Sequence, residues 1–217
     1  MNRPSHDVIQ ELLNEMTRIV VDYHPAVGRT APMVARLIQG TAFFPGGTGL
    51  WRGDGYFGPD PQYFPECPVM FVGHNFDSIE AHEASQSRGG EVGSFFWKIL
   101  KGYLHAAALS PEECFFTNVL MGLKPGSALG PMPSVPGYQE QCLHFFLRQV
   151  AIVRPRAIVA LGNHARALIT KAARDVRVTQ AMHPSAREFK HLSTRAARVA
   201  AQGVALREFL ANTLACS

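Results

Sequence analysis

Residues 68–78 of the chain read PVMFVGHNFDS. The five residues Pro68–Val72 form an uninterrupted apolar run, which predicts a short strand that is buried on both faces. Gly73 is expected to end this strand, and the polar residues His74 and Asn75 follow directly. A buried strand with polar side chains at its end is typical of a sheet that carries a site along its edge.

The same pattern recurs three times toward the C-terminus. Short segments rich in apolar or β-branched residues predict further strands over Cys114–Val119, Ala157–Leu161 and Val176–Ala181. Apolar residues at helical spacing predict helices over Ser94–Leu109, Gly137–Val153, His164–Ala173 and from Ser193 onward. Strands that alternate with helices predict an α/β protein, a three-layer α/β/α sandwich with a central four-stranded parallel sheet.

We expect one domain over residues 1–217, with residues 1–67 packed on a core formed by 68–217. Helices are predicted at the N-terminus over Asp7–Val21 and between Thr30 and Gly40. Residues 40–68 hold seven aromatic side chains among many Gly and Pro. Exposing so many rings to water would cost free energy, which favours an ordered loop packed by its rings. A lid over a pocket is the alternative for this segment.

Composition and cysteine spacing limit the class of protein. The 217 residues are 47% hydrophobic and 18% charged, as in globular proteins. No apolar run approaches the ~18 residues of a membrane span, and acidic residues near the N-terminus argue against a secretory signal. The four cysteines lie far apart, so neither a disulfide framework nor a zinc ribbon is expected, and we predict a protein of the reducing cytoplasm. They are Cys67, Cys114, Cys142 and Cys216.

The charge is distributed unevenly along the chain. The net charge is +4, but residues 145–217 carry 12 Lys and Arg against 3 Asp and Glu, whereas residues 1–80 carry a net −4. This excess is a weak indication of a polyanionic partner that binds the C-terminal third. Arginines on solvated helix faces are the alternative interpretation.

Polar side chains follow every predicted strand. In open parallel sheets, ligands bind beyond the carboxyl ends of the strands, so these groups should meet at one edge. Each group also has a structural interpretation, since Asn75 and Asn163 could cap helices and Asn118 could bond its own turn. His183 could equally make a single structural hydrogen bond. Together they predict a site, with side chains from Gly73–Ser78, Thr117–Asn118, Gly162–His164 and His183–Arg187.

In this order, the segments resemble the motifs of the uracil-DNA glycosylase superfamily over about Pro68–Arg187. The likeness is nearest to the mismatch-specific and single-strand-selective branches. Five motifs in one order are specific, although each alone is weak. They are residues 73–77 (similar to Gly-x-Asn-Pro-Gly), 95–98 (Arg-Phe-Trp-Lys of the mismatch-specific branch), 116–119 (the Thr-Asn-Val strand end), 154–162 (Pro-x-x-Ile-x-x-Leu-Gly) and 183–185 (the start of His-Pro-Ser-Pro).

The resemblance implies a DNA glycosylase that acts in base excision repair without a metal or cofactor. Such a hydrolase flips uracil or a related damaged base out of the DNA and cleaves its N-glycosidic bond. By this resemblance, His183 would donate a hydrogen bond to uracil O2, and Asn118 would read O4 and N3–H. Asn75 would orient the attacking water, with Asp77 as an alternative.

Other matching positions are expected to contact the base or the DNA. Phe76 or Phe95 could stack on the base, although a core role is favoured for Phe95. The residues expected at the base are Gly73, His74, Phe76 and Ser185, and those expected at the DNA are Arg187 and Lys190.

The predicted partner is DNA, bound by a monomer that has no membrane partner. Some branches of the superfamily hold an iron–sulfur cluster, but here Gly122 stands at one of the ligand positions. We therefore expect no cluster, and Cys142 should be a buried helix residue.

Two other functions stay open. A member of the superfamily could keep the fold and bind nucleic acid or nucleotides without excising uracil. A metal-dependent hydrolase is the third hypothesis, although the sequence has no pair of His residues four apart with an intervening Glu. Its candidate ligands are His74, Asp77, His82 and His183.

Overall fold

Four parallel strands form the centre of the protein, in the order β2-β1-β3-β4. The computed structural model describes residues 3–17, 41–53, 58–76, 78–88, 94–123, 136–173 and 175–213. The strands are β1 (Val69–Asn75), β2 (Cys114–Leu120), β3 (Ala157–Leu161) and β4 (Val178–Ala181). The helices are α1 (Ser5–Thr17), α2 (Ile79–Ser87), α3 (Phe95–Ala106), α4 (Pro136–Val153), α5 (Asn163–Ala172) and α6 (Leu192–Ala211), with short 3-10 turns η1 (Pro111–Glu113) and η2 (Arg187–Phe189).

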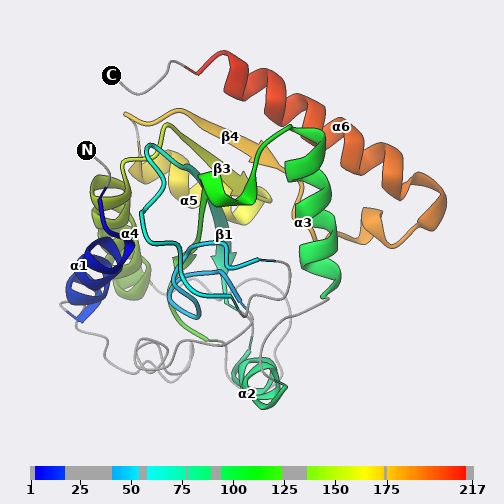
Figure 1. Ribbon diagram of the computed structural model, residues 1–217. Coiled ribbons are helices and arrows are strands. Elements are labelled where there is room, and N and C mark those ends of the chain that lie inside the picture. Colours follow the sequence, from blue (N-terminus) through cyan, green and yellow to red (C-terminus); the bar gives the residue numbers. More distant parts are fainter. Residues whose placement is uncertain are drawn as a thin grey trace.

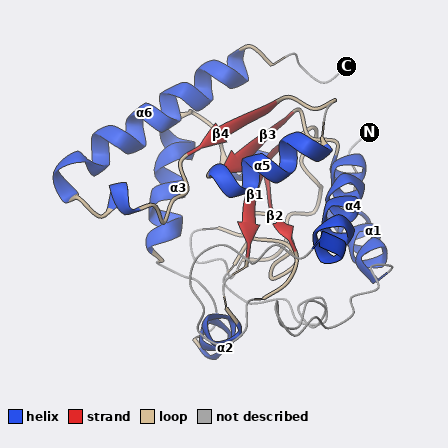
Figure 2. Ribbon diagram, turned by 180° about the vertical axis from the view of Figure 1, so that it is seen from behind, coloured by secondary structure: helices blue, strands red, loops and turns tan. Residues whose placement is uncertain are grey.

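Each face of the sheet has its own hydrophobic core. Successive side chains of a strand point to opposite faces, so Met70 and Val72 of β1 join the core under α1, α4 and α5. Val69 and Phe71 join the core under α3 and α6, and all four side chains are fully buried. Burial on both faces is the reason that this strand is apolar at successive positions. Helices therefore cover both faces (Figures 1 and 2), which confirms the predicted three-layer α/β/α sandwich.

The loop of residues 41–53, called the N-terminal loop, covers the edge of the sheet at β2. The Phe44 N–H donates to the Phe116 carbonyl at 2.9 Å, and the Phe116 N–H donates to the Gly49 carbonyl at 2.8 Å. Both Phe44 and Trp51 are buried. An uncovered edge strand would leave unpaired backbone donors and acceptors. The described part of residues 40–68 is therefore a packed loop, as predicted.

Several elements differ from the sequence-based prediction, and α3 ends at Ala106 rather than at Leu109. β1 continues through Gly73 to Asn75, because both residues still pair with β2. β4 begins at Val178, two residues later than expected. Helix α2 was not predicted, because its sequence IEAHEASQS has almost no apolar spacing. The helix expected before Gly40 lies outside the described residues, as does any part of the first helix beyond Thr17.

The cysteines have different environments. Cys114 and Cys142 are free and buried, and Cys142 lies in α4 as predicted. Cys67 is disulfide-bonded, which differs from the expectation based on cysteine spacing, because separation along the sequence does not decide which segments the fold brings together. Among the described residues, the helices are all too short or too polar to cross a membrane.

Candidate active site at the carboxyl ends of the strands

Asn118 of β2 and Gly73 of β1 are paired neighbours in the sheet. A Cβ atom on residue 73 would lie 2.1 Å from Oδ1 of Asn118, so the absence of a side chain at Gly73 is what gives the Asn118 amide its space. Asn118 is buried, with 5% of its surface exposed. Its amide, which can offer both a donor and an acceptor, is thus held beside the end of β1.

His74 and Asn75 are the last two residues of β1, and their side chains contact each other. Nδ1 of His74 lies 2.7 Å from Oδ1 of Asn75, and Nδ2 of Asn75 donates to the Phe76 carbonyl. With the amide in this orientation, Nδ1 of His74 carries a proton and donates it. Asn75 therefore does not cap the following helix. Ser78 does, because its Oγ accepts from the Ala81 N–H at 3.2 Å.

His183 follows β4, and the backbone orients its ring. Nδ1 of His183 accepts a hydrogen bond from the Ser185 N–H at 3.1 Å, so the neutral ring carries its proton on Nε2. The ring lies beside Phe96, with centroids 5.6 Å apart. Gly162 has a φ of +88°, and a Cβ there would lie 3.1 Å from the Cβ of His183. The turn after β3 thus leaves room for the histidine.

Three histidines from three strand ends lie close together. The rings of His74 and His164 are 5.3 Å apart. The pKa of His183 is lowered chiefly by burial, which disfavours the imidazolium, and further by the charges of His74 and His164. His183 is therefore neutral at neutral pH. The sequence placed His164 at a strand end of the predicted site but gave it no role there.

Both backbone polar groups of Met182, the residue before His183, are bonded to helix side chains. The Tyr103 hydroxyl of α3 donates to the Met182 carbonyl at 2.9 Å. The Met182 N–H donates to Oε1 of Gln202 of α6 at 2.7 Å. Sequence reasoning missed both residues, because a tyrosine and a glutamine on packed helices give no signal of their partners.

Phe43, from the N-terminal loop, lies between the end of β1 and the Phe96 ring that contacts His183. Its Cε1 lies 3.8 Å from the Cβ position of residue 73, and its ring centroid is 5.5 Å from that of Phe96, which contacts His183. Phe43 is itself buried. The loop therefore supplies an aromatic wall between the end of β1 and His183, a role that its composition alone did not indicate.

Other candidate residues have different outcomes. Asn163 does not cap α5, because Gly162 is the N-cap of that helix and no side chain bonds to the cap. Oδ1 of Asn163 instead accepts from Nε2 of Gln180 of β4 at 2.5 Å. Phe76 is buried in the core beside α3. Phe95 is 36% exposed, so the core role favoured for it was wrong. Asp77 lies outside the described residues.

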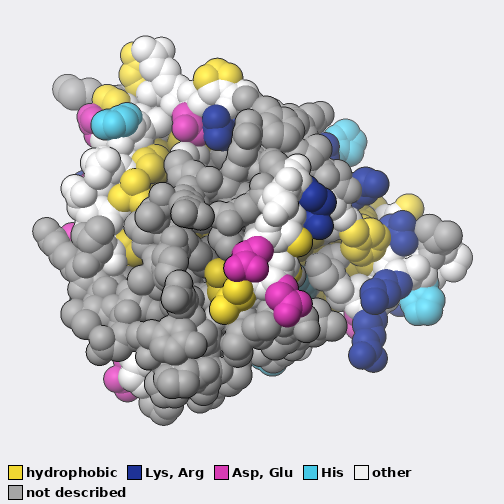
Figure 3. Space-filling view, turned by 90° about the horizontal axis from the view of Figure 1, so that it is seen from below, with side chains coloured by type: hydrophobic (Ala, Val, Ile, Leu, Met, Phe, Trp, Pro, Cys, Tyr) yellow, Lys and Arg dark blue, Asp and Glu magenta, His cyan; other side chains and the backbone are white. Residues whose placement is uncertain are grey.

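Ser185, Arg187 and Lys190 are exposed residues that follow His183 along the chain. Arg187 begins η2, and Lys190 comes directly after that turn. Figure 3 views the molecule from below Figure 1, the side toward which β1 and β2 point. Lys and Arg side chains gather there where η2 and α6 begin. The two candidate DNA-binding residues thus belong to a basic part of the surface close to the site.

A metal centre finds no support in the described part of the chain. There, no group of three or more His, Cys, Asp and Glu side chains is placed to hold an ion. Of the four ligands named in the hydrolase hypothesis, Asp77 and the His82 side chain lie outside the description.

Comparison with known protein families gives a match. A sequence model described as the uracil DNA glycosylase superfamily matches residues 61–203, about two thirds of the chain. The matched range includes all four strands and every residue of the site except Phe43. The search of curated proteins gives no match.

Proposed function

The chain belongs to the uracil DNA glycosylase superfamily, and from this premise we propose that it excises uracil or a related damaged base from DNA by hydrolysing the N-glycosidic bond. The superfamily supports a glycosylase-type activity on DNA in general. The particular substrate and the roles of the individual residues are proposed. We also propose that the protein acts as a monomer in the cytoplasm.

The observation that carries the proposal is the orientation of His183. Because Nδ1 accepts from the Ser185 N–H, the Nε2–H is the group available for a ligand. When the C1′–N1 bond breaks, the departing uracil takes the bonding electrons and becomes an anion. A preorganised N–H donor toward O2 would stabilise that anion, and one such donor contributes about 3–4 kcal/mol to lowering the barrier.

Asn118 is suited to recognise the base. Its amide is buried beside Gly73, where a flipped base would have its polar edge close to the end of β1. An amide can donate to O4 and accept from N3–H of uracil, whereas cytosine presents an amino group and an unprotonated N3. The same amide orientation would therefore discriminate against cytosine.

Asn75 is proposed to hold the attacking water. Its Oδ1 accepts from His74, and an amide oxygen has a second lone pair for a water proton. An amide is a very poor base, so it can orient water but hardly deprotonate it. The water oxygen bonds to C1′ as the base leaves, and its proton passes to solvent. No step requires a metal or a cofactor.

Single-turnover excision tests the proposal. Labelled oligonucleotides would carry uracil in a single strand, opposite adenine and opposite guanine, and wild type would be compared with His183→Ala. We expect abasic product from wild type, unaffected by a chelator, and a loss of about 100- to 1,000-fold in the variant. Equal rates for the two proteins would remove the assignment of His183.

The second candidate is a protein of the same fold that binds uracil-containing DNA without excising the base. It is favoured by one observation: both polar atoms of the Asn75 amide already have protein partners. Tight binding to DNA containing uracil, with no abasic product at high enzyme excess, would select this candidate over the glycosylase.

A further inference from the structure

Basic residues are concentrated at one end of α6. Between residues 187 and 198 there are four Lys and Arg and one Glu, whereas in the rest of α6 Arg207 and Glu208 balance each other. We call the four the basic strip, and Figure 3 shows Lys and Arg gathered on this side. The strip consists of Arg187, Lys190, Arg195 and Arg198.

An exposed aromatic ring lies against this strip. The Arg195 guanidinium carbon is 4.9 Å from the centroid of the Phe95 ring. Nε of Arg195 also donates to the carbonyl of Phe189 at 2.6 Å, and Phe189 is fully buried. Arg195 is therefore anchored to the core, and it holds the Phe95 ring in place while 36% of that residue stays exposed.

Phe95 is the chain neighbour of a residue that contacts the candidate site. Phe95 is the first residue of α3, and the next residue, Phe96, contacts the ring of His183. An exposed cation–π pair contributes only about 0.5–1 kcal/mol to folding. Stability alone gives little reason to keep a large apolar ring in water beside the Arg195 guanidinium.

We propose that the Phe95–Arg195 pair and the basic strip bind single-stranded DNA next to the target nucleotide. The ring stacks on an unpaired base, and the strip contacts the phosphates of the same strand. Surfaces of this composition, an aromatic platform beside positive charge, suit single strands, whose bases expose their faces. In a duplex those faces are covered by neighbouring bases. The proposal rests on the proposed function for DNA as the partner, but not on catalysis.

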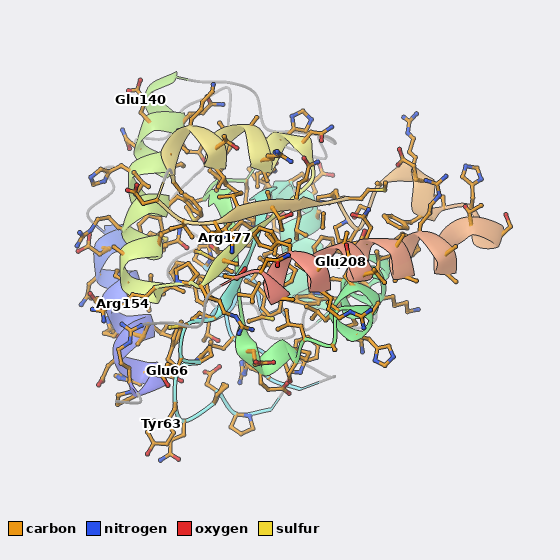
Figure 4. The ribbon with its side chains drawn as sticks, turned by 90° about the horizontal axis from the view of Figure 1, so that it is seen from above. Tyr63, Glu66, Glu140, Arg154, Arg177 and Glu208 are labelled. Carbon is orange, nitrogen blue, oxygen red and sulfur yellow. The ribbon has the colours of Figure 1, made fainter. Side chains whose placement is uncertain are left out.

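The test measures binding of uracil-free oligonucleotides, so that excision plays no part. Fluorescence anisotropy would give the Kd of wild type and Phe95→Ala for a single-stranded thymine oligomer and for a duplex of the same length. Phe95→Ala should weaken single-strand binding about tenfold and duplex binding less than twofold. Phe95→Trp should restore the single-strand affinity. Tyr63→Ala is the matched control, because Tyr63 is 50% exposed and points outward at the periphery (Figure 4), and it should change nothing.

The salt dependence of single-strand binding tests the basic strip. Two arginine variants of the same helix, α6, are compared. Arg198→Ala should reduce the slope of log K against log salt concentration by about 0.7, the value for one phosphate of a single strand. Arg207→Ala, on the balanced half of α6, should leave the slope unchanged.

Two results would overturn the inference: single-strand affinity unaltered in Phe95→Ala, or equal losses for single strand and duplex. Failure of the proposed function has a different signature, because a protein that never excises uracil could still show the Phe95 effect on uracil-free DNA.

Discussion

The hydroxyl of Tyr103 donates a hydrogen bond to the carbonyl oxygen of Met182 at 2.9 Å, which connects the C-terminal half of α3 to the residue before His183. Gln202 of α6 accepts from the N–H of the same residue at 2.7 Å. Two helices thus fix the backbone that leads into the proposed catalytic histidine. Tyr103 is fully buried, so its hydroxyl position is set by core packing.

Tyr103→Phe should lower the single-turnover excision rate about tenfold while leaving the Kd for uracil-containing DNA unchanged. The substitution removes the donor to Met182 but keeps the ring, and it leaves a buried carbonyl unsatisfied at a cost of about 1–3 kcal/mol. Tyr138→Phe is the control, since Tyr138 is buried in α4 in the other core. A rate equal to that of wild type would show that Met182 needs no support from α3.

The sheet could be predicted well from the sequence, because a strand that is buried on both faces has apolar residues at consecutive positions. β3 has its predicted bounds, Ala157–Leu161, since every position of that run is buried on one face or the other. The site was predicted less completely. The Tyr103–Met182 bond spans 79 residues, and a tyrosine at helical spacing cannot be distinguished from a core residue. Phe95 was wrongly predicted to lie in the core. Trp97 faces the core, and residues two positions apart on an α-helix point to nearly opposite sides.

Excision should fall as the pH decreases through the pKa of His183, which lies below the ordinary histidine value of 6.5. Protonation of Nδ1 would place a proton against the Ser185 N–H and break the bond that orients the ring. A depressed pKa means that the active neutral form is present at neutral pH and is lost on the acid side. Rates measured between pH 4.5 and 8 would define this acid limb.

His164→Gln should move the acid limb to higher pH. The charge of His164 lowers the pKa of His183, so its removal lets the imidazole protonate more readily. His105→Gln, a change at an exposed residue of α3, is the matched control and should leave the limb in place. An unchanged acid limb in His164→Gln would show that His164 does not contribute to the pKa of His183.

Gly73→Ala should reduce excision about a hundredfold without unfolding the protein. The new Cβ would lie 2.1 Å from Oδ1 of Asn118, so the amide must move, and a displacement of about 1 Å at a reacting group can cost a hundredfold in rate. A double-mutant cycle with Asn118→Ala provides the check. Once the Asn118 amide is removed, adding Gly73→Ala should lower the excision rate little further. Additive losses in rate would show that Gly73 does not act through Asn118.

Asn75→Asp should increase the excision rate at least about tenfold. A carboxylate can act as a general base, which contributes about 10²–10⁴-fold, whereas the amide cannot. The new oxygen would face the Phe76 carbonyl, which now accepts from Nδ2, and this repulsion offsets part of the gain. Single-turnover rates would be compared with Asn75→Ala as reference. A carboxylate variant no faster than wild type would argue against Asn75 as the water-holding residue.

Gly203→Ala should destabilise the protein by about 1–3 kcal/mol, contrary to the usual preference of helices for alanine. A Cβ on Gly203 of α6 would lie 2.3 Å from the Cβ of Ala106 and 2.9 Å from the Tyr103 carbonyl oxygen. Neither neighbour can rotate away, so α6 must move from α3, and Gln202 moves with it. Gly137→Ala in α4 is the control, because nothing lies within 4 Å of its Cβ position. Urea unfolding would measure both, and equal stabilisation by the two alanines would show that α3 and α6 are not packed this closely.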